Sequence, residues 1–108
     1  EIEHIYARNR QEKEGTLSDP NNVESLGNKA LLEKRINIRA SDYRFDDKKK
    51  YYEGFTNTKG QAKEGTGIIE LLGLTSSSTD FTEADIVNRY NEMMKSFIGY
   101  LKTNDLLQ

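Results

Sequence analysis

The 108-residue sequence contains no cysteine, no tryptophan, one proline and one histidine. Without cysteine it has no disulfide framework, no thiolate zinc site and no cysteine nucleophile, and this composition fits the reducing cytoplasm, where we expect the protein. Long apolar runs are also missing. The longest, residues 68–74, is interrupted by Glu70 and Gly73 and is too short to cross a bilayer, so we expect no membrane association. No signal-peptide pattern opens the sequence.

Large aliphatic residues are scarce, close to the level at which disorder becomes the default, but the net charge is only −2. We therefore expect one folded domain over residues 1–108 with long polar loops. Because the sequence starts without Met inside a strand-like pattern, Ile2-Glu3-His4-Ile5, we expect it to be a fragment of a longer protein.

Positive charge is concentrated between residues 29 and 63, a segment that contains ten basic and five acidic residues. The rest of the chain is correspondingly acidic. Such a run can be a solvated face or the footprint of a phosphate-bearing partner, and charge alone leaves both interpretations open.

The hydrophobic patterns predict short strands and several helices. Period-two alternation favours a strand over residues 1–6, and residues 30–32 suit a second short strand. Turn residues without helical spacing predict a loop over residues 7–22. From Glu33 the spacing becomes helical, with Ile36 and Ala40 four residues apart. A helix is expected from about Asp46 to a stop at Gly54, since acids precede bases along it.

The C-terminal half is predicted to be a mobile loop, a short helix, a linker and a long helix. The loop covers residues 56–67, the short helix residues 68–74 with its end at Gly73, and the linker residues 75–80. Thr82 and Asp85 form a capping-box pair, which begins the last helix. Its apolar stripe is assigned to the core and consists of Ile86, Tyr90, Met93, Phe97 and Leu101.

His4 is the only imidazole, so any imidazole-dependent mechanism must use it. A single histidine is more often structural than catalytic, and its neighbours in the sequence decide between the two readings. Polar motifs follow it in a defined order. They are Ile2-Glu3-His4-Ile5, Leu26-Gly27-Asn28, Leu31-Leu32, Ile36-Asn37-Ile38, Lys48-Lys49-Lys50-Tyr51-Tyr52 and Ile86-Val87-Asn88-Arg89.

This ordered set, with nine residues from Asn28 to Asn37, resembles the HNH or His-Me finger nuclease motif. In particular it is similar to the C-terminal nuclease domain of GmrSD-type, SspE-like, modification-dependent restriction proteins. The sequence departs from other HNH enzymes at two positions. Glu3 stands where many of them have Asp, and Asn37 stands where other members have His.

The resemblance implies an α+β fold with a ββα-metal core over residues 1–53, followed by a loop and closing helices over residues 54–108. It implies a metal-dependent DNA endonuclease of an anti-phage restriction system. His4 would be the general base, and Asn28 would support the catalytic loop. Glu3 and Asn37 would hold Mg²⁺ or Mn²⁺, since hard oxygen ligands favour these ions.

The basic residues after the histidine are expected to flank the cleft and contact phosphates, which positions DNA without reading its sequence. The expected contacts are Lys29, Lys34, Arg35, Arg39, Lys48 and Lys49. The implied partners are DNA and an upstream domain of the same polypeptide, expected to be a nucleotide-hydrolysing sensor. Two alternatives stay open: a non-catalytic module of the same fold that binds nucleic acid or a partner, and an RNA-cutting or toxin-like nuclease.

Overall fold

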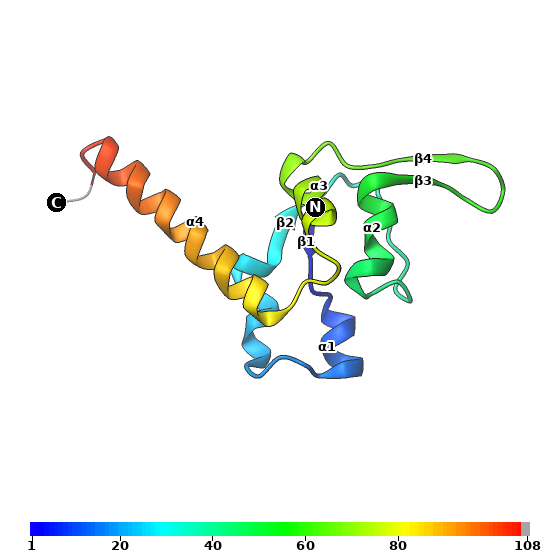
Figure 1. Ribbon diagram of the computed structural model, residues 1–108, viewed down its shortest axis with the longest axis horizontal. Coiled ribbons are helices and arrows are strands. Elements are labelled where there is room, and N and C mark those ends of the chain that lie inside the picture. Colours follow the sequence, from blue (N-terminus) through cyan, green and yellow to red (C-terminus); the bar gives the residue numbers. More distant parts are fainter. Residues whose placement is uncertain (107–108) are drawn as a thin grey trace.

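The computed structural model describes residues 1–106, which form a mixed α+β structure, as predicted. This part of the chain contains four α-helices, two 3₁₀-helices and two separate two-stranded antiparallel sheets. Helix α4 (Glu83–Thr103) leaves the body on one side, and the hairpin of β3 (Gly54–Thr56) and β4 (Ala62–Glu64) extends on the other (Figure 1). None of the described helices has the length and apolar character needed to cross a membrane.

The first sheet pairs β1 (Ile2–His4) with β2 (Lys29–Leu31), which confirms the two predicted strands. Its register sets Glu3 opposite Ala30 and His4 opposite Lys29. The segment between the strands includes two 3₁₀-helices, η1 (Pro20–Glu24) and η2 (Leu26–Asn28).

Helix α2 (Phe45–Glu53) confirms the helix expected from about Asp46. Two acidic residues lie in its first turn, where they complement the positive end of the helix dipole. It ends at Gly54, whose φ of 94° is readily available only to glycine. Its Phe45 and Tyr52 are fully buried and help to build the core.

The loop predicted for residues 7–22 is partly wrong, because α1 (Arg8–Glu14) lies within it. The buried side of this short helix is formed by a charged residue, so no apolar spacing reveals it. Arg10 is 9% exposed, its guanidinium carbon lies 4.6 Å from the Tyr6 ring centroid, and it donates two hydrogen bonds to Asp80. A contact across 70 residues thus completes the helix.

Two further predictions between residues 33 and 67 are wrong. Residues 32–44 contain neither helix nor strand; Ile36 is buried there without a helix around it. The predicted mobile loop contains the β3–β4 hairpin, whose register sets Phe55 opposite Lys63. The end of this hairpin is tied to residues 33–35, since Arg35 donates to the carbonyl oxygens of Glu64 and Gly65.

Helix α3 (Ile69–Ser77) runs through Gly73, so the predicted stop at this glycine and the start of the linker are wrong. Helix α4 begins as predicted, with the backbone N–H and the hydroxyl of Thr82 both donating to Asp85. Its apolar stripe is not a core element along its length. Ile86 is fully buried, whereas Tyr90 is 40% and Phe97 54% exposed, because the helix projects beyond the body.

The first turns of α4 are docked on η2 through Gly27 and Arg89. A Cβ at Gly27 would lie 2.0 Å from the backbone oxygen of Ile86, so only glycine allows this approach. The Arg89 guanidinium donates to the carbonyl oxygens of Leu26, Gly27 and Lys29. The closing helix is therefore attached to the loop that leads into β2.

Candidate active site

His4 and Lys29 lie side by side on the paired strands, and both reach Glu24 at the end of η1. The Nε2 atom of His4 is 3.2 Å from Glu24 Oε2, and the ammonium of Lys29 is also 3.2 Å from that oxygen. Arg8 Nε donates to the other oxygen at 2.6 Å. These contacts, led by the Arg8 hydrogen bond, lower the pKa of Glu24 to about 2, so it is a carboxylate at neutral pH.

Asn28 is completely buried behind this cluster and joins three segments of backbone. Its Oδ1 accepts from the Tyr6 N–H at 2.6 Å, and its Nδ2 donates at 2.8 Å to the carbonyl oxygens of Tyr6 and Val23. Its own carbonyl accepts from the N–H of Ile5 at 2.9 Å. The amide therefore holds the exit of β1, directly after His4, against the 3₁₀ segment.

Glu3 occupies the opposite face of β1, as alternation along a strand requires. Its Oε2 accepts from the Tyr52 hydroxyl at 2.6 Å and from the Lys48 ammonium at 3.3 Å. Lys48 also donates to the carbonyl oxygen of His4 at 2.6 Å. Burial lowers the pKa of Lys48 despite the nearby carboxylate, and burial together with Glu3 raises the pKa of Tyr52.

Asn37 and Glu3 line one pocket of about 180 Å³ next to the N-terminus of the chain. Asn37 is exposed, and within residues 1–106 its side-chain amide makes no hydrogen bond. Over the same residues Glu3 Oε1 accepts none either, so two residues that line this pocket each carry an oxygen without a hydrogen-bond partner, the type of ligand that Mg²⁺ prefers. The donor set therefore fits a magnesium-type ion, although the Lys48 ammonium already offsets part of the Glu3 charge. No group of three or more His, Cys, Asp and Glu side chains that could hold a metal occurs in the described part of the chain.

The predicted catalytic residues thus fall into two groups. Glu3 and Asn37 share a pocket on one side of β1, whereas the His4 ring lies with Glu24 on the other and does not line that pocket. Between the groups, β1 is held by Asn28 on its loop side and by Lys48 from α2.

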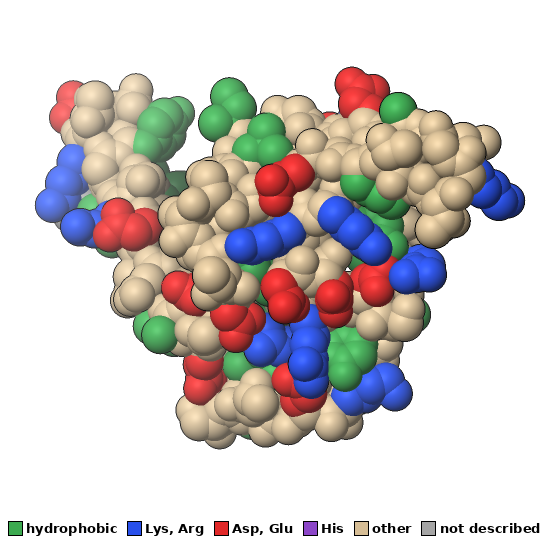
Figure 2. All heavy atoms as spheres, turned by 45° about the vertical axis from the view of Figure 1, so that its right-hand side comes forward, with side chains coloured by type: hydrophobic (Ala, Val, Ile, Leu, Met, Phe, Trp, Pro, Cys, Tyr) green, Lys and Arg blue, Asp and Glu red, His purple; other side chains and the backbone are tan. Residues whose placement is uncertain are grey.

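The predicted DNA contacts differ in their surroundings. Lys34 is exposed, and Lys49 lies 5.7 Å from the Phe45 ring centroid. Lys29 pairs with Glu24, Arg39 pairs with Asp42, and Arg35 is bound to backbone carbonyls. Figure 2 shows the consequence on the side of the hairpin, where cations and carboxylates are interspersed instead of forming one basic surface.

Lys48 departs most from its predicted role, since its side chain is 5% exposed and its ammonium points inward to Glu3. In this arrangement the ammonium cannot contact a phosphate. Its position four residues before Tyr52 on α2 explains why both reach the same carboxylate. Sequence reasoning missed this pairing, because neighbouring lysines made Lys48 look like part of a solvated run.

Glu24 is the functional candidate that sequence reasoning missed. Nothing in the residues around it suggests that it meets His4, which lies 20 positions earlier. The antiparallel register, with His4 opposite Lys29, and the position of the end of η1 bring the carboxylate and the imidazole together.

Residues 1–96 match the family described as GmrSD restriction endonucleases, C-terminal domain. This range runs from β1 into α4 and includes every site residue described above. No curated protein and no solved structure matches the chain.

Proposed function

Because this chain belongs to the C-terminal domain family of GmrSD restriction endonucleases, we propose that it hydrolyses phosphodiester bonds in DNA as an HNH-type nuclease with a ββα-metal core. The core would comprise β1, β2 and α2. Its support is the contact of α2 with β1 through Lys48 and Tyr52. The family description as a C-terminal domain also supports an upstream domain, which we propose to be a nucleotide-hydrolysing sensor.

His4 acts as the general base in this proposal, which requires the scissile phosphate to lie where it meets both the His4 ring and the Glu3–Asn37 pocket on the other face of β1. The observation that carries the assignment is its contact with Glu24, the carboxylate that orients the ring. If Nε2–H donates to Glu24, the Nδ1 lone pair is free to take a proton from an attacking water. Glu24 is then a positioning residue, and Asn28 is one too, because its amide holds the backbone that follows His4.

Glu3 and Asn37 would hold the divalent ion through Glu3 Oε1 and the Asn37 amide oxygen, the two unoccupied donors of their shared pocket. Bound there, Mg²⁺ or Mn²⁺ supplies Lewis-acid stabilisation of the charge on phosphate oxygens and on the leaving oxygen. The chain's own residues contribute the rest. Lys48 and Tyr52 fix the Glu3 carboxylate from behind.

Among the basic residues, Lys34 and Lys49 are the candidates for phosphate contact that carry no carboxylate partner within residues 1–106. Lys29 would contribute only by giving up its pairing with Glu24. Lys48 is left out of the DNA-binding set, because it is buried.

Nicking of supercoiled plasmid with Mg²⁺ or Mn²⁺ tests the proposal, with chelator as the blank. Removing a general base by His4→Ala is expected to lower the rate about 10²- to 10⁴-fold. Glu24→Gln is expected to lower it less, because the amide still accepts from the ring. Asn88→Ala, an exposed position on α4, is the control and should cut like the wild type.

Equal nicking by His4→Ala and wild type would overturn the assignment of the base. Salt-dependent DNA binding without any cleavage or need for a divalent ion would instead identify a non-catalytic binding module. Parallel digests of RNA and DNA distinguish the RNA-cutting alternative.

A further inference from the structure

A pocket lies between α2, the β3–β4 hairpin and residues 35–37, and we refer to it as the hairpin pocket. Its volume of about 440 Å³ falls within the range of small-molecule sites, about 300–1,000 Å³. None of the catalytic steps above uses it. It nevertheless adjoins the pocket of Glu3, because Asn37 lines both.

Aromatic rings form one wall of the hairpin pocket. Tyr51 and Phe55 meet edge to face with their centroids 5.2 Å apart, and Phe55 is only partly buried. The Tyr51 hydroxyl is held by Asp42 at 2.5 Å, which fixes the orientation of this wall. Lys50 Nζ lies 5.4 Å from the Phe55 centroid. That ammonium lies over one face of the Phe55 ring, so the wall offers a ligand the other face, beside a cation.

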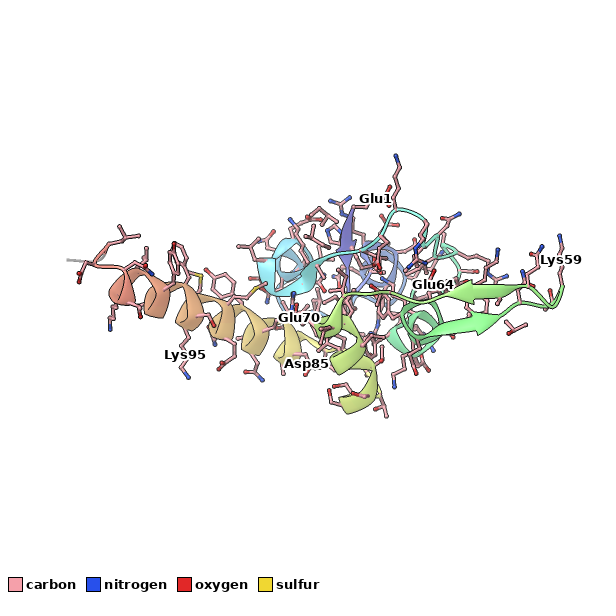
Figure 3. The ribbon with its side chains drawn as sticks, turned by 90° about the horizontal axis from the view of Figure 1, so that it is seen from above. Glu1, Lys59, Glu64, Glu70, Asp85 and Lys95 are labelled. Carbon is pink, nitrogen blue, oxygen red and sulfur yellow. The ribbon has the colours of Figure 1, made fainter. Side chains whose placement is uncertain are left out.

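Two cationic residues, one amide and one acidic residue, Glu64, complete the pocket on its other sides. The register pairs Lys63 with Phe55, so the two side chains lie on the same face of the hairpin. Arg35 contributes a guanidinium that the carbonyl oxygens of Glu64 and Gly65 hold in place. Asn37 contributes an amide that can both donate and accept. Figure 3 shows Glu64 where the hairpin joins the body and Lys59 at its tip.

A ring face, an amide and flanking cations are the elements that recognise a nucleotide: the ring stacks on a base, the amide bonds its edge and the cations contact phosphates. An acidic peptide would use the cations but leave the ring face without a stacking partner. Within a double helix both faces of each base are covered, so such a pocket can accept only a base that has left the stack.

We propose that the hairpin pocket binds one unstacked base of a DNA strand, beside the phosphate that the Glu3 and Asn37 side would hold; its place in cleavage rests on the nuclease function proposed above. Sharing Asn37 puts the bound base next to the scissile phosphate. The pocket then favours DNA whose strands are open at the cut, and the hairpin is the element that selects it.

Binding is measured by fluorescence anisotropy with a labelled single strand of about ten nucleotides and with the matching duplex, in chelator so that cleavage does not occur. The single strand is expected to bind more tightly than the duplex. Phe55→Ala should weaken single-strand binding about tenfold, the lower part of the range for one stacked base. Phe55→Tyr keeps a ring and should keep the affinity.

Three further variants keep the result interpretable. Phe55 also packs on the core, so Phe55→Leu retains apolar bulk without a stacking face and should lose affinity as Phe55→Ala does. Phe97→Ala removes a half-exposed ring from α4, on the opposite side of the body, and should bind like the wild type. Lys63→Ala should reduce the slope of log affinity against log salt concentration by about one, the value for one phosphate contact.

The proposal that the pocket binds a base would be overturned if Phe55→Leu bound the single strand as tightly as the wild type does. It would also be overturned if the duplex bound as tightly as the single strand. Competition by polyglutamate as strong as by the unlabelled strand would also overturn it in favour of an acidic peptide. The two proposals fail separately. If single-strand binding depends on Phe55 but no metal-dependent nicking occurs, only the proposed nuclease function is refuted. If nicking occurs but binding does not depend on Phe55, only the proposed base-binding pocket is refuted.

Discussion

The side chain of Asn28 is expected to be worth more to the fold than any other single polar group in the region of the site. Truncation by Asn28→Ala removes three side-chain hydrogen bonds and leaves the N–H and carbonyl of Tyr6 and the carbonyl of Val23 without that partner. A buried backbone group that loses its partner costs about 1–3 kcal/mol, and the Val23 carbonyl, being partly buried, belongs at the low end. We expect a loss of about 3–5 kcal/mol in the free energy of unfolding.

Urea titration followed by far-ultraviolet circular dichroism measures this loss, with thermal unfolding as the second readout. Since about 1 kcal/mol shifts the midpoint by about 4–8 °C in a domain near this size, Tm should fall by more than about 12 °C. Asn91→Ala, exposed on α4, is the matched control and should stay within about 0.5 kcal/mol of wild type. A loss below about 1 kcal/mol for Asn28→Ala would refute the reasoning that this amide holds the strand exit.

Two further predictions concern the docking of α4 and the loss of stability at low pH. Gly27→Ala should destabilise the domain by about 2 kcal/mol or more in urea titration, because its Cβ would meet the backbone oxygen of Ile86. Gly73→Ala, in open space on α3, should instead stabilise the domain by about 0.5–1 kcal/mol. Changes in the free energy of unfolding that have the same sign for both variants would contradict this prediction. The Ser18 hydroxyl and other donors of the neighbouring loop lower the pKa of Glu83 from 4.5 to about 2, so its stabilising effect is complete above pH 4.5 and is lost as pH falls through about 2. Tm measured against pH should therefore decline over this window, and Glu83→Gln should lower Tm at pH 7 and flatten the decline.

The parts of the fold that the sequence predicts are those with local signals. The alternation around His4, the acids at the start of α2 with Gly54 at its end, and the Thr82–Asp85 pair each act within one turn or one strand. Local hydrogen bonding and dipole effects suffice to place these elements, so no knowledge of distant contacts is needed.

The parts that it does not predict depend on distant partners. Helix α1 is completed by the contact of Arg10 with Asp80, and the hairpin is held by Arg35, about 30 residues before its end. The stripe on α4 illustrates a different limit. Helical spacing identifies the apolar face, but it does not say how far along the helix other elements cover that face, and here cover ends soon after Ile86.

The same limit applied to the candidate site. Motif order suggested Glu3, His4, Asn28 and Asn37, and alternation along residues 1–6 already puts Glu3 and His4 on opposite sides of the strand. Which groups each side meets depends on the pairing of β1 with β2 and on the contact with α2. Glu24 could not be predicted, because its role depends on where η1 ends in space.

The short strand β1 lies against a buried charged side chain, Lys48, and a buried charge is unusual in a protein core. A three-residue strand gains little from its own hydrogen bonds, and burying Lys48 against Glu3 carries a desolvation penalty that an apolar pair would avoid. The fold nevertheless fixes both polar side chains of β1 from outside the strand, His4 through Glu24 and Glu3 through Lys48 and Tyr52. Stability alone would favour apolar residues at these positions, whereas a reaction that needs a base and a carboxylate at set positions requires such supports. Because departures from local rules gather at functional sites, the cluster of them around β1 favours a chemical role for His4 and Glu3 over a structural one.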